Sequence, residues 1–429
     1  MEHKRKCVLV SLNDDISEIR ELADSLELDV LTIFVQFRKN PNPKYYVGSG
    51  KVKEIKDYID ENKIDIAVFN ASLKPSQQYN LENFLEITVF DRIRLILEIF
   101  ADRAHSEEAK LQVELAKLQY EIPLLRDWIH KARYGERPGF MAGGEYEVAQ
   151  YYEICKRRIK KNKQKLKKIE KEREIRRKQR REIGYYLVSI VGYTNAGKST
   201  LFNLIAGESV AVEDKLFTTL STTTRRISDL KKPIILTDTV GLIDNLPHWI
   251  IGAFHSTLEE IFLSDLILLI IDGSEPIDEI NRKLKTSFDV LLPDLEPSKI
   301  VLLINKIDKV QLNNRDKEEI LDKVTKNLLT AIVVDHKIKD IIPLSAIEEE
   351  YKENIINLII DVFDYPARLS IVLPNQENTQ SFVSWLHSHC EIQSIKYGRQ
   401  IKIDLKCREK NVNHITKKSS ELGGNATIS

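Results

Sequence analysis

The stretch Gly192-Tyr193-Thr194-Asn195-Ala196-Gly197-Lys198-Ser199 matches the pattern G-x-x-x-x-G-K-[ST]. An apolar strand is predicted directly before it, and a helical pattern that starts Thr200-Leu-Phe-Asn follows it. In this context glycines let backbone N–H groups turn toward phosphate oxygens, the Lys reaches the β- and γ-phosphates, and the Ser ligates Mg²⁺. The stretch therefore predicts a P-loop in which all eight residues contact a nucleotide.

The chain around this stretch alternates apolar strands with helical patterns. Apolar runs at 187–191, 234–237, 266–272, 300–304 and 341–344 predict strands, because they are short and rich in Ile, Leu and Val. Such alternation is typical of a parallel sheet covered by helices. We therefore expect an α/β fold, with a Ras-like P-loop domain (the G domain) over residues 183–366.

A second motif, Asn305-Lys306-Ile307-Asp308, directly follows a predicted strand and favours guanine over adenine. The Asp308 carboxylate can accept hydrogen bonds from guanine N1–H and from its exocyclic amine, a pair that adenine lacks. Asn305 can contact the base edge, while the Lys306 stem can lie across the ring. One strand later, the stretch Ser345-Ala346-Ile347 can offer a backbone N–H to guanine O6. Together with the P-loop, these residues predict a guanine-nucleotide site.

A third motif, Asp238-Thr239-Val240-Gly241, closes the predicted strand at 234–237. The Asp238 carboxylate can hold Mg²⁺ through water, and the Gly241 backbone N–H can contact the γ-phosphate. Residues 217–226, between the P-loop and this motif, contain five Thr. One of them is expected to complete the Mg²⁺ shell when GTP is bound, but spacing alone does not say which.

Three further segments flank the G domain. Residues 1–92 alternate strands and helices and predict a small parallel α/β domain. Residues 93–182 carry two apolar stripes joined by a Gly-rich stretch, which predicts an antiparallel, coiled-coil-like helical hairpin whose first arm is interrupted at Pro123. Residues 367–429 predict a small α+β unit.

Charge is strongly segregated, although 65 basic and 65 acidic residues leave the whole chain without net charge. Residues 156–181, in the second arm of the hairpin, include 16 Lys or Arg and three Glu, a net charge of +13. This basic run has two interpretations. It is either a solvated helix face or, more specifically, a surface that contacts the phosphates of a nucleic acid. Its few apolar positions argue against a membrane face.

The composition excludes other classes of protein. No apolar run approaches the roughly 20 residues of a membrane helix, so we expect no stable membrane insertion. Four scattered Cys residues do not suit a disulfide framework. We therefore expect a reduced, cytoplasmic protein.

The motifs and their flanks resemble the HflX family of GTPases, relatives of Obg. The resemblance covers about residues 40 to 365. In the G domain it is carried by Thr222-Thr-Thr-Arg-Arg-Ile227, Asp238-Thr-Val-Gly-Leu-Ile243, Leu246-Pro-His248 and Ser256-Thr-Leu-Glu-Glu260. Before the G domain it is carried by Asn42-Pro-Lys-Tyr-Tyr-Val-Gly-Ser-Gly-Lys51, Pro75-Ser-Gln-Gln78, Asp91-Arg92 and Ala109-Lys-Leu-Gln-Val-Glu-Leu-Ala-Lys-Leu118.

The resemblance implies an Mg²⁺-dependent GTPase that binds the large ribosomal subunit and couples GTP binding and hydrolysis to splitting or rescue of ribosomes. It implies that the Gly-rich tip at 133–144 and the basic arm contact ribosomal RNA. It also implies that Thr219 joins Ser199 as an Mg²⁺ ligand. The residues around Thr219 would line the nucleotide: Phe217, Thr218, Thr219, Leu220 and Ser221. We expect a monomer.

The predicted catalytic residues are Lys198, Asn195 and Gly241. Many GTPases carry a water-orienting Gln just after Asp-x-x-Gly, and here that place is taken by Leu242, which cannot hydrogen bond to water. Hydrolysis by the isolated protein should therefore be slow, and a partner or a cation should accelerate it. Asn195 either seats an activating K⁺ near the phosphates or is an ordinary loop residue.

Two other classes of protein are also alternatives on the sequence alone. A P-loop kinase or ATPase would share the P-loop, but the motif ending in Asp308 speaks against it. The alternative is an RNA-binding scaffold, or a ribosome-biogenesis GTPase acting on another RNA. The intact set Lys198, Ser199, Asp238 and Gly241 argues against a scaffold that lacks catalysis.

Overall fold

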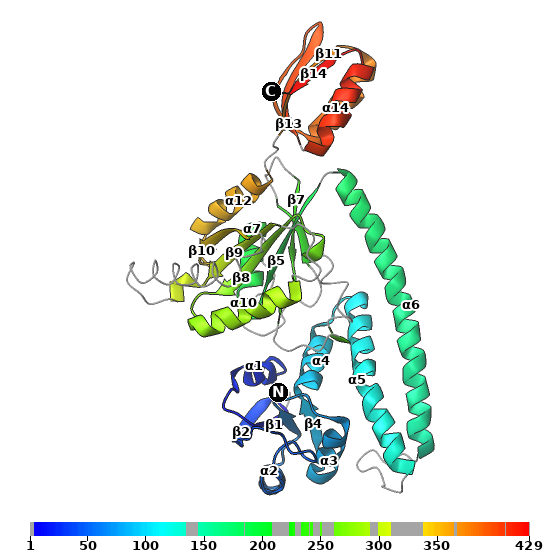
Figure 1. Ribbon diagram of the computed structural model, residues 1–429, viewed down its shortest axis with the longest axis vertical. Helices are drawn as coiled ribbons and strands as arrows, with labels where there is room; N and C mark the ends of the chain where they lie inside the picture. Colours follow the sequence, from blue (N-terminus) through cyan, green and yellow to red (C-terminus); the bar gives the residue numbers. More distant parts are fainter. Residues whose placement is uncertain are drawn as a thin grey trace.

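The computed structural model describes residues 4–133, 145–183, 185–207, 223–227, 233–239, 241–242, 249–250, 261–291, 299–309, 338–363, 367–407 and 409–428. Figure 1 shows three sheet-containing units along the long axis and a helical hairpin beside them. The expected α/β class is confirmed: two of the three sheets are mainly parallel and covered by helices.

The N-terminal sheet has four parallel strands in the order β2-β1-β3-β4. Along β1, Cys7 and Leu9 face α1, while Val8 and Val10 lie in the core formed with α2 and α3. The alternation of side chains along a strand thus lets helices cover both faces. The elements are β1 (Lys6–Ser11), α1 (Ser17–Ser25), β2 (Asp29–Val35), α2 (Ser49–Asn62), β3 (Ile66–Phe69), α3 (Pro75–Leu85) and β4 (Thr88–Asp91).

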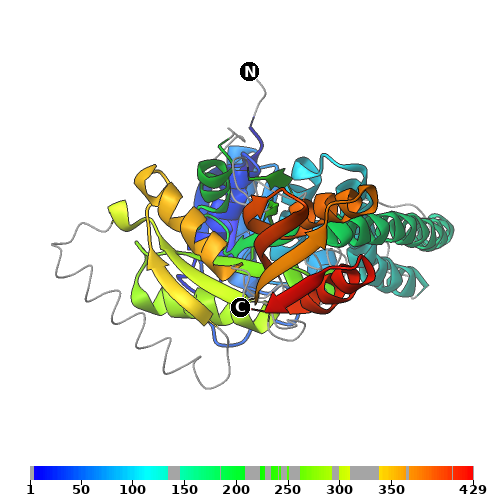
Figure 2. The same cartoon turned by 90° about the horizontal axis from the view of Figure 1, so that it is seen from above.

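Three helices follow this sheet: α4 (Arg92–Arg103), α5 (Glu107–Arg133) and α6 (Glu145–Ile183). Helices α5 and α6 run side by side, and Figure 2 shows them extending to one side of the central sheet. Leu118 and Leu125 of α5 pack against Val148 and Cys155 of α6. Leu118 belongs to the predicted apolar stripe of the first arm, and Val148 and Cys155 belong to that of the second, which explains why the helices pair. Leu125 lies beyond Pro123, where the sequence predicts the end of the first stripe.

Helix α5 continues through Pro123, so the predicted interruption there is wrong. Proline removes one backbone donor and strains the preceding turn, at a cost of about 3 kcal/mol in a helix interior. Leu118 and Leu125, on either side of it, are both buried against α6. Packing of both flanking turns against the same partner helix offsets that cost.

The central sheet has the order β10-β9-β8-β5-β7-β6, and among its described strands only β6 is antiparallel to its neighbour. Helices α7 and α12 cover one face and α10 covers the other (Figures 1 and 2). Its elements are β5 (Tyr186–Gly192), α7 (Lys198–Ala206), β6 (Thr223–Arg226), β7 (Ile234–Asp238), β8 (Leu266–Asp272), α10 (Ile277–Leu291), β9 (Lys299–Asn305), β10 (Ile338–Pro343) and α12 (Glu350–Val362).

The N-terminal and central units share one apolar core. Leu22 of α1 and Phe100 of α4 belong to the same buried cluster as Leu284 and Phe288 of α10. Figure 1 shows α1 directly below α10. The N-terminal unit therefore packs on the face of the central sheet that α10 covers.

The C-terminal sheet is antiparallel, with the order β12-β13-β11-β14. Its sequence of elements, β-α-β-β-α-β, is the split βαβ arrangement of ferredoxin-like folds. Sequence patterns predicted an α+β unit here, but they did not predict two of its strands, β12 and β14. The elements are β11 (Ala367–Pro374), α13 (Glu377–His389), β12 (Glu391–Lys396), β13 (Gln400–Cys407), α14 (Glu409–Glu421) and β14 (Asn425–Ile428).

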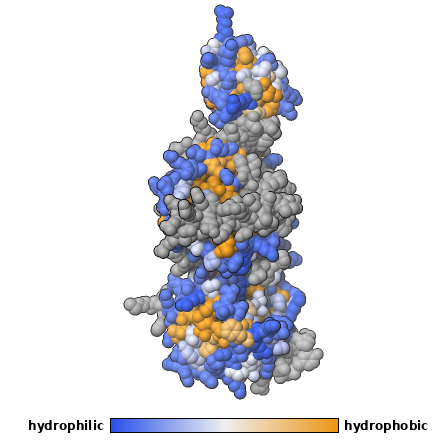
Figure 3. Space-filling view, turned by 60° about the vertical axis from the view of Figure 1, so that its left-hand side comes forward, coloured by the Kyte–Doolittle hydropathy of each residue, from blue (hydrophilic) through white to orange (hydrophobic). Residues whose placement is uncertain are grey.

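On the face shown in Figure 3, apolar residues gather in separate patches among hydrophilic ones. Within the part of the chain that the structure describes, no helix combines the length and the apolar character needed to cross a membrane.

Candidate nucleotide-binding site

The predicted motifs meet at the carboxyl ends of β5, β7, β9 and β10, where ligands bind in open parallel α/β sheets. At two P-loop positions only glycine fits, because atoms of other residues lie where a Cβ would be. A Cβ on Gly192 would lie 2.2 Å from the Ile270 carbonyl oxygen, and one on Gly197 would lie 2.2 Å from Asn305 Nδ2. Gly197 also has φ +96°, a left-handed conformation that side chains disfavour.

Asn305 joins the P-loop to the loop after β10. Its Nδ2 donates to the Ala196 carbonyl oxygen at 2.8 Å, and its Oδ1 accepts from the Ala346 backbone N–H at 2.9 Å. The side chain is 2% exposed. Its amide is thus engaged by backbone groups within the protein, so Asn305 positions the two loops on either side of the site.

Lys306 and Asp308 are each held by a polar partner. Lys306 Nζ donates to Asp272 Oδ2 at 2.7 Å, and Ser345 Oγ donates to Asp308 Oδ1 at 2.8 Å. Burial would raise the pKa of Asp272, but hydrogen bonds from Lys306 and Ser274 outweigh it and hold that pKa below its usual value. Asp308 lies exposed, with its carboxylate available to a ligand.

Asp272 lies at the site although no sequence motif predicted it there. The available signal was its place as the last residue of the apolar strand β8, at the same sheet edge as the motifs.

Lys198 begins α7 and lies almost completely buried, 8% exposed. Its Nζ donates to the Tyr193 carbonyl oxygen at 2.7 Å. Burial, with a smaller contribution from Lys306, lowers the pKa of Lys198 to about 8, and Asp238 opposes this shift. An ammonium held here is poorly solvated, so a phosphate group beside it would stabilise its charged form.

Ser199 and Asp238 lie close enough to share one cation. Ser199 Oγ donates to Asp238 Oδ2 at 3.0 Å. Asp238 is 2% exposed, and the next residue, Thr239, donates from Oγ1 to the Ile190 carbonyl oxygen at 2.6 Å. A hydroxyl oxygen and a carboxylate form the hard oxygen set that suits Mg²⁺, so these residues fit the ion that the motifs predict.

Gly241 lies against the P-loop, where a Cβ would stand 2.7 Å from Thr194 Cγ2 and 3.0 Å from Lys198 Nζ. Leu242 follows it and is tied to the P-loop backbone. Its N–H donates to the Gly192 carbonyl oxygen, and its own carbonyl accepts from the Thr194 N–H, both at 3.0 Å. The Leu242 side chain is 5% exposed and points into the shared core.

Several other predicted residues are placed by the structure. The Tyr193 side chain lies in the shared core, so only its backbone faces the loop. Asn195 is exposed with φ +61°, and Ile307 starts a short 3₁₀ helix, Ile307–Lys309. Ile347 is 70% exposed. Phe217, Thr218, Thr219, Leu220, Ser221 and Val240 lie outside the described residues, as does the Gly-rich tip apart from Arg133.

Comparison with known proteins agrees with this geometry. Residues 13–101 match the family described as GTP-binding GTPase N-terminal, residues 103–180 match GTP-binding GTPase Middle Region, and residues 187–306 match 50S ribosome-binding GTPase. Fold and family together define a P-loop GTPase, an enzyme that hydrolyses GTP to GDP and phosphate.

The chain belongs to the HflX family. It is 42% identical over 411 residues to GTPase HflX of Thermococcus kodakarensis, covering 95% of this chain and 91% of that one. It is 40% identical over 403 residues to GTPase HflX of Methanocaldococcus jannaschii, with 94% and 95% covered. Over 303 residues it is 38% identical to GTPase HflX of Escherichia coli, with 70% of each chain covered.

A solved structure shares the fold. The crystal structure of a protein named SsGBP in complex with GDP is 29% identical and aligns with a TM-score of 0.51, covering 84% of this chain and 98% of that one.

Proposed function

We propose that the site assembled around Lys198 binds GTP and Mg²⁺ through the residues named in the motifs. The main support for this proposal is the pair of hydrogen bonds made by the Asn305 side-chain amide. They connect the P-loop to the Ser345-Ala346 loop. The P-loop backbone and Lys198 would bind the phosphates, and Asp308 with the Ala346 region would bind guanine. Ser199, and Thr219 outside the described residues, would ligate Mg²⁺, which neutralises charge that develops on the phosphates.

In this proposal the protein's own residues supply positioning and charge rather than a covalent step. Lys198 offers a cation beside the phosphates. Gly241 lies next to Lys198, so we expect its backbone N–H to contact the γ-phosphate. Leu242 contributes no group to a water molecule because its side chain is buried. Rapid hydrolysis therefore needs electrostatic help from outside the chain.

We propose further that this help comes from the large ribosomal subunit, and that GTP binding and hydrolysis control splitting or rescue of ribosomes. Support comes from the name of the family that matches residues 187–306, 50S ribosome-binding GTPase. An independent support is helix α6, where the basic arm (residues 156–181) carries +13.

The basic arm is built for sequence-independent contact with phosphates. Most of its Lys and Arg side chains are exposed, and Figures 1 and 2 show α6 on the outside of the hairpin. Arg173 is an exception, since it is paired with Glu108 of α5. The remaining exposed cations can neutralise RNA phosphates and release counterions, a contribution that is lost as salt rises.

The first experiment measures GTP hydrolysis at physiological salt with and without purified large ribosomal subunits. We expect a rise of tenfold or more, on the order of 1.4 kcal/mol off the barrier. The triple variant Lys160→Gln, Lys161→Gln, Lys163→Gln should bind subunits more weakly and with a shallower salt dependence. The matched control replaces Lys53, Lys110 and Lys402, which are exposed outside the arm, by Gln.

Unchanged hydrolysis together with no subunit binding at low salt would contradict the ribosome as partner. Equal loss of binding in the arm variant and the control would contradict the specific role of the arm. Splitting is tested separately, by light scattering of intact ribosomes mixed with the protein and a non-hydrolysable GTP analogue; an unchanged signal would contradict it. If large ribosomal subunits do not stimulate GTP hydrolysis but another RNA does, the protein is a GTPase that acts on that RNA.

A further inference from the structure

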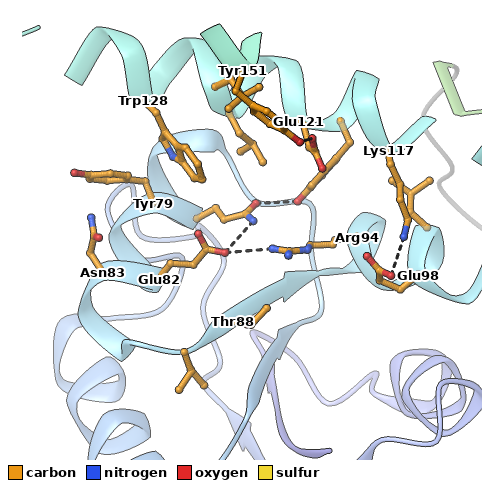
Figure 4. Close-up of a pocket in the computed structure, with 16 residues that line it drawn as sticks. Tyr79, Glu82, Asn83, Thr88, Arg94, Glu98, Lys117, Glu121, Trp128 and Tyr151 are labelled. Carbon is orange, nitrogen blue, oxygen red and sulfur yellow. Dashed lines mark hydrogen bonds and ion pairs between the residues drawn. The ribbon is translucent and has the colours of Figure 1, made fainter. Parts of the chain in front are cut away.

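A cavity of about 270 Å³ lies where the N-terminal unit meets the hairpin, and it takes no residue from the P-loop (Figure 4). Helix α3, the start of β4, helix α4 and helix α5 form its walls, and Tyr151 of α6 closes one side. It is therefore separate from the nucleotide-binding site, and an occupant would contact both the sheet unit and the hairpin.

The base of the cavity is a connected polar network. Tyr120 Oη donates to Gln78 Oε1 at 2.8 Å, and Gln78 Nε2 donates to Glu82 Oε1 at 3.4 Å. Arg94 Nη1 pairs with the same Glu82 oxygen at 3.3 Å (Figure 4). The Arg94 guanidinium is thus already engaged by a carboxylate.

The second lining cation, Lys117, is engaged as well, because its Nζ lies 2.8 Å from Glu98 Oε2. A third carboxylate, Glu121, accepts a hydrogen bond from Tyr151 Oη at 3.1 Å and forms no ion pair with any other described residue. Three carboxylates against two cations leave the lining with one excess negative charge. This balance disfavours an anionic ligand and favours a cationic one.

The remaining walls are aromatic and apolar. Tyr79, Trp128 and Tyr151 line the cavity with Leu124 and Leu125. Trp128 Nε1 is buried and has no hydrogen-bond partner among the described residues. Aromatic faces attract cations and pack against flat apolar groups, so these walls suit the body of an organic cation.

We propose that this cavity is a binding site for a small organic ammonium cation with an aromatic or branched apolar body. The ammonium group lies beside the Glu121 carboxylate, and the body packs between Trp128 and Leu125. The proposal rests on the charge of the lining, on the aromatic walls and on the volume of the cavity, and it is independent of the nucleotide-binding site.

Three probes of nearly equal shape test the charge preference with the full chain: phenethylamine, 2-phenylethanol and phenylacetate. Binding is followed by ligand-observed saturation-transfer NMR, and the midpoint of thermal unfolding gives a second readout. We expect phenethylamine to bind at least tenfold more tightly than the neutral alcohol and to raise the midpoint. Phenylacetate should show no binding.

Two variants locate the site. Glu121→Gln keeps the shape and removes the carboxylate, so it should weaken phenethylamine at least tenfold and leave the alcohol unchanged. Glu153→Gln is the matched control, because Glu153 is exposed on α6 outside the cavity. If Glu121→Gln does not fold, Asn83→Lys adds a cation at the lining instead and should abolish phenethylamine binding.

The proposal is overturned by equal binding of the three probes, by preference for phenylacetate, or by no binding of any probe at 10 mM. It is also overturned if phenethylamine binds a folded Glu121→Gln or Asn83→Lys variant as tightly as the unmodified chain.

Discussion

Asn305 Nδ2 donates to the carbonyl oxygen of Ala196 at 2.8 Å, although 109 residues separate them in the chain. The same side chain accepts from the Ala346 N–H, so one buried amide connects the phosphate loop to the loop after β10. Because Gly197 Cα lies against this amide, there is no room there for a larger residue. Asn305 therefore fixes the position of the phosphate-binding loop relative to the loop expected to bind the base.

Replacing Asn305 by Ala should weaken guanine-nucleotide binding and also destabilise the protein. It leaves the Ala196 carbonyl and the Ala346 N–H without their partner, at about 1–3 kcal/mol for each buried group. We expect fluorescent GDP analogues to bind on the order of 10- to 100-fold more weakly. The control is Asp308→Asn: it replaces the carboxylate that would bind guanine but keeps an acceptor oxygen for the buried Ser345 hydroxyl, so that variant should lose affinity while its free energy of unfolding changes by less than about 0.5 kcal/mol. Equal unfolding free energies in both variants would contradict a positioning role for Asn305.

The free energy of unfolding of the nucleotide-free protein should depend on the protonation of Lys198. Its pKa is lowered to about 8 by burial, whereas an unfolded Lys titrates near 10.5. Between these values the unfolded state binds more protons, so stability rises with pH across that window. Relative to Lys198→Met, the unmodified protein should gain about 2 kcal/mol between pH 7.5 and 9.5 in urea unfolding. Parallel pH curves for the two proteins would contradict this prediction.

Introducing Gln at position 242 should not create a faster GTPase. The Leu242 side chain is 5% exposed within the core shared with α10 and the N-terminal unit. A buried amide without partners there costs about 2 kcal/mol, so Leu242→Gln should lower the free energy of unfolding. Single-turnover GTP hydrolysis should stay slow, and Leu242→Met serves as the apolar control. A rise in single-turnover rate with unchanged stability would show that the side chain reaches the phosphates.

Asn195 provides a test of cation activation. It is exposed in the P-loop with φ +61°, a conformation that Asn and Gly adopt readily. If its amide seats K⁺ beside the phosphates, hydrolysis should be on the order of tenfold faster in KCl than in NaCl. Asn195→Gly keeps the backbone conformation and should remove the difference between the salts. Equal turnover in KCl and NaCl for the unmodified protein would eliminate the cation role.

Sequence patterns predicted the four strands of the N-terminal sheet and every strand of the central sheet except β6, because each of these is a short apolar run between polar turns, whereas β6 reads Thr-Thr-Arg-Arg. They failed for β12 and β14 in the C-terminal unit. The burial pattern of β14 has no buried residue, and β12 is at most half-buried, since both are edge strands. Ile392 and Ile395 of β12 and Ala426 of β14 pack against the core, but the apolar alternation that marks a strand is weak because so few residues of these edge strands are buried. Division of the chain at residues 92, 182 and 366, and a monomeric state, stay predictions.

The class of this protein follows from its sequence alone. The P-loop, the Asp238–Gly241 motif and the Asn305–Asp308 motif are local, because short stretches of backbone and side chain carry their chemistry. Three relationships become visible only in the folded chain: Asn305 holds two loops, Lys306 pairs with Asp272, and Leu242 is buried. These relationships join residues far apart in the chain, and their partners are defined by burial and by the geometry of parallel strands. No periodicity or spacing in the sequence encodes them.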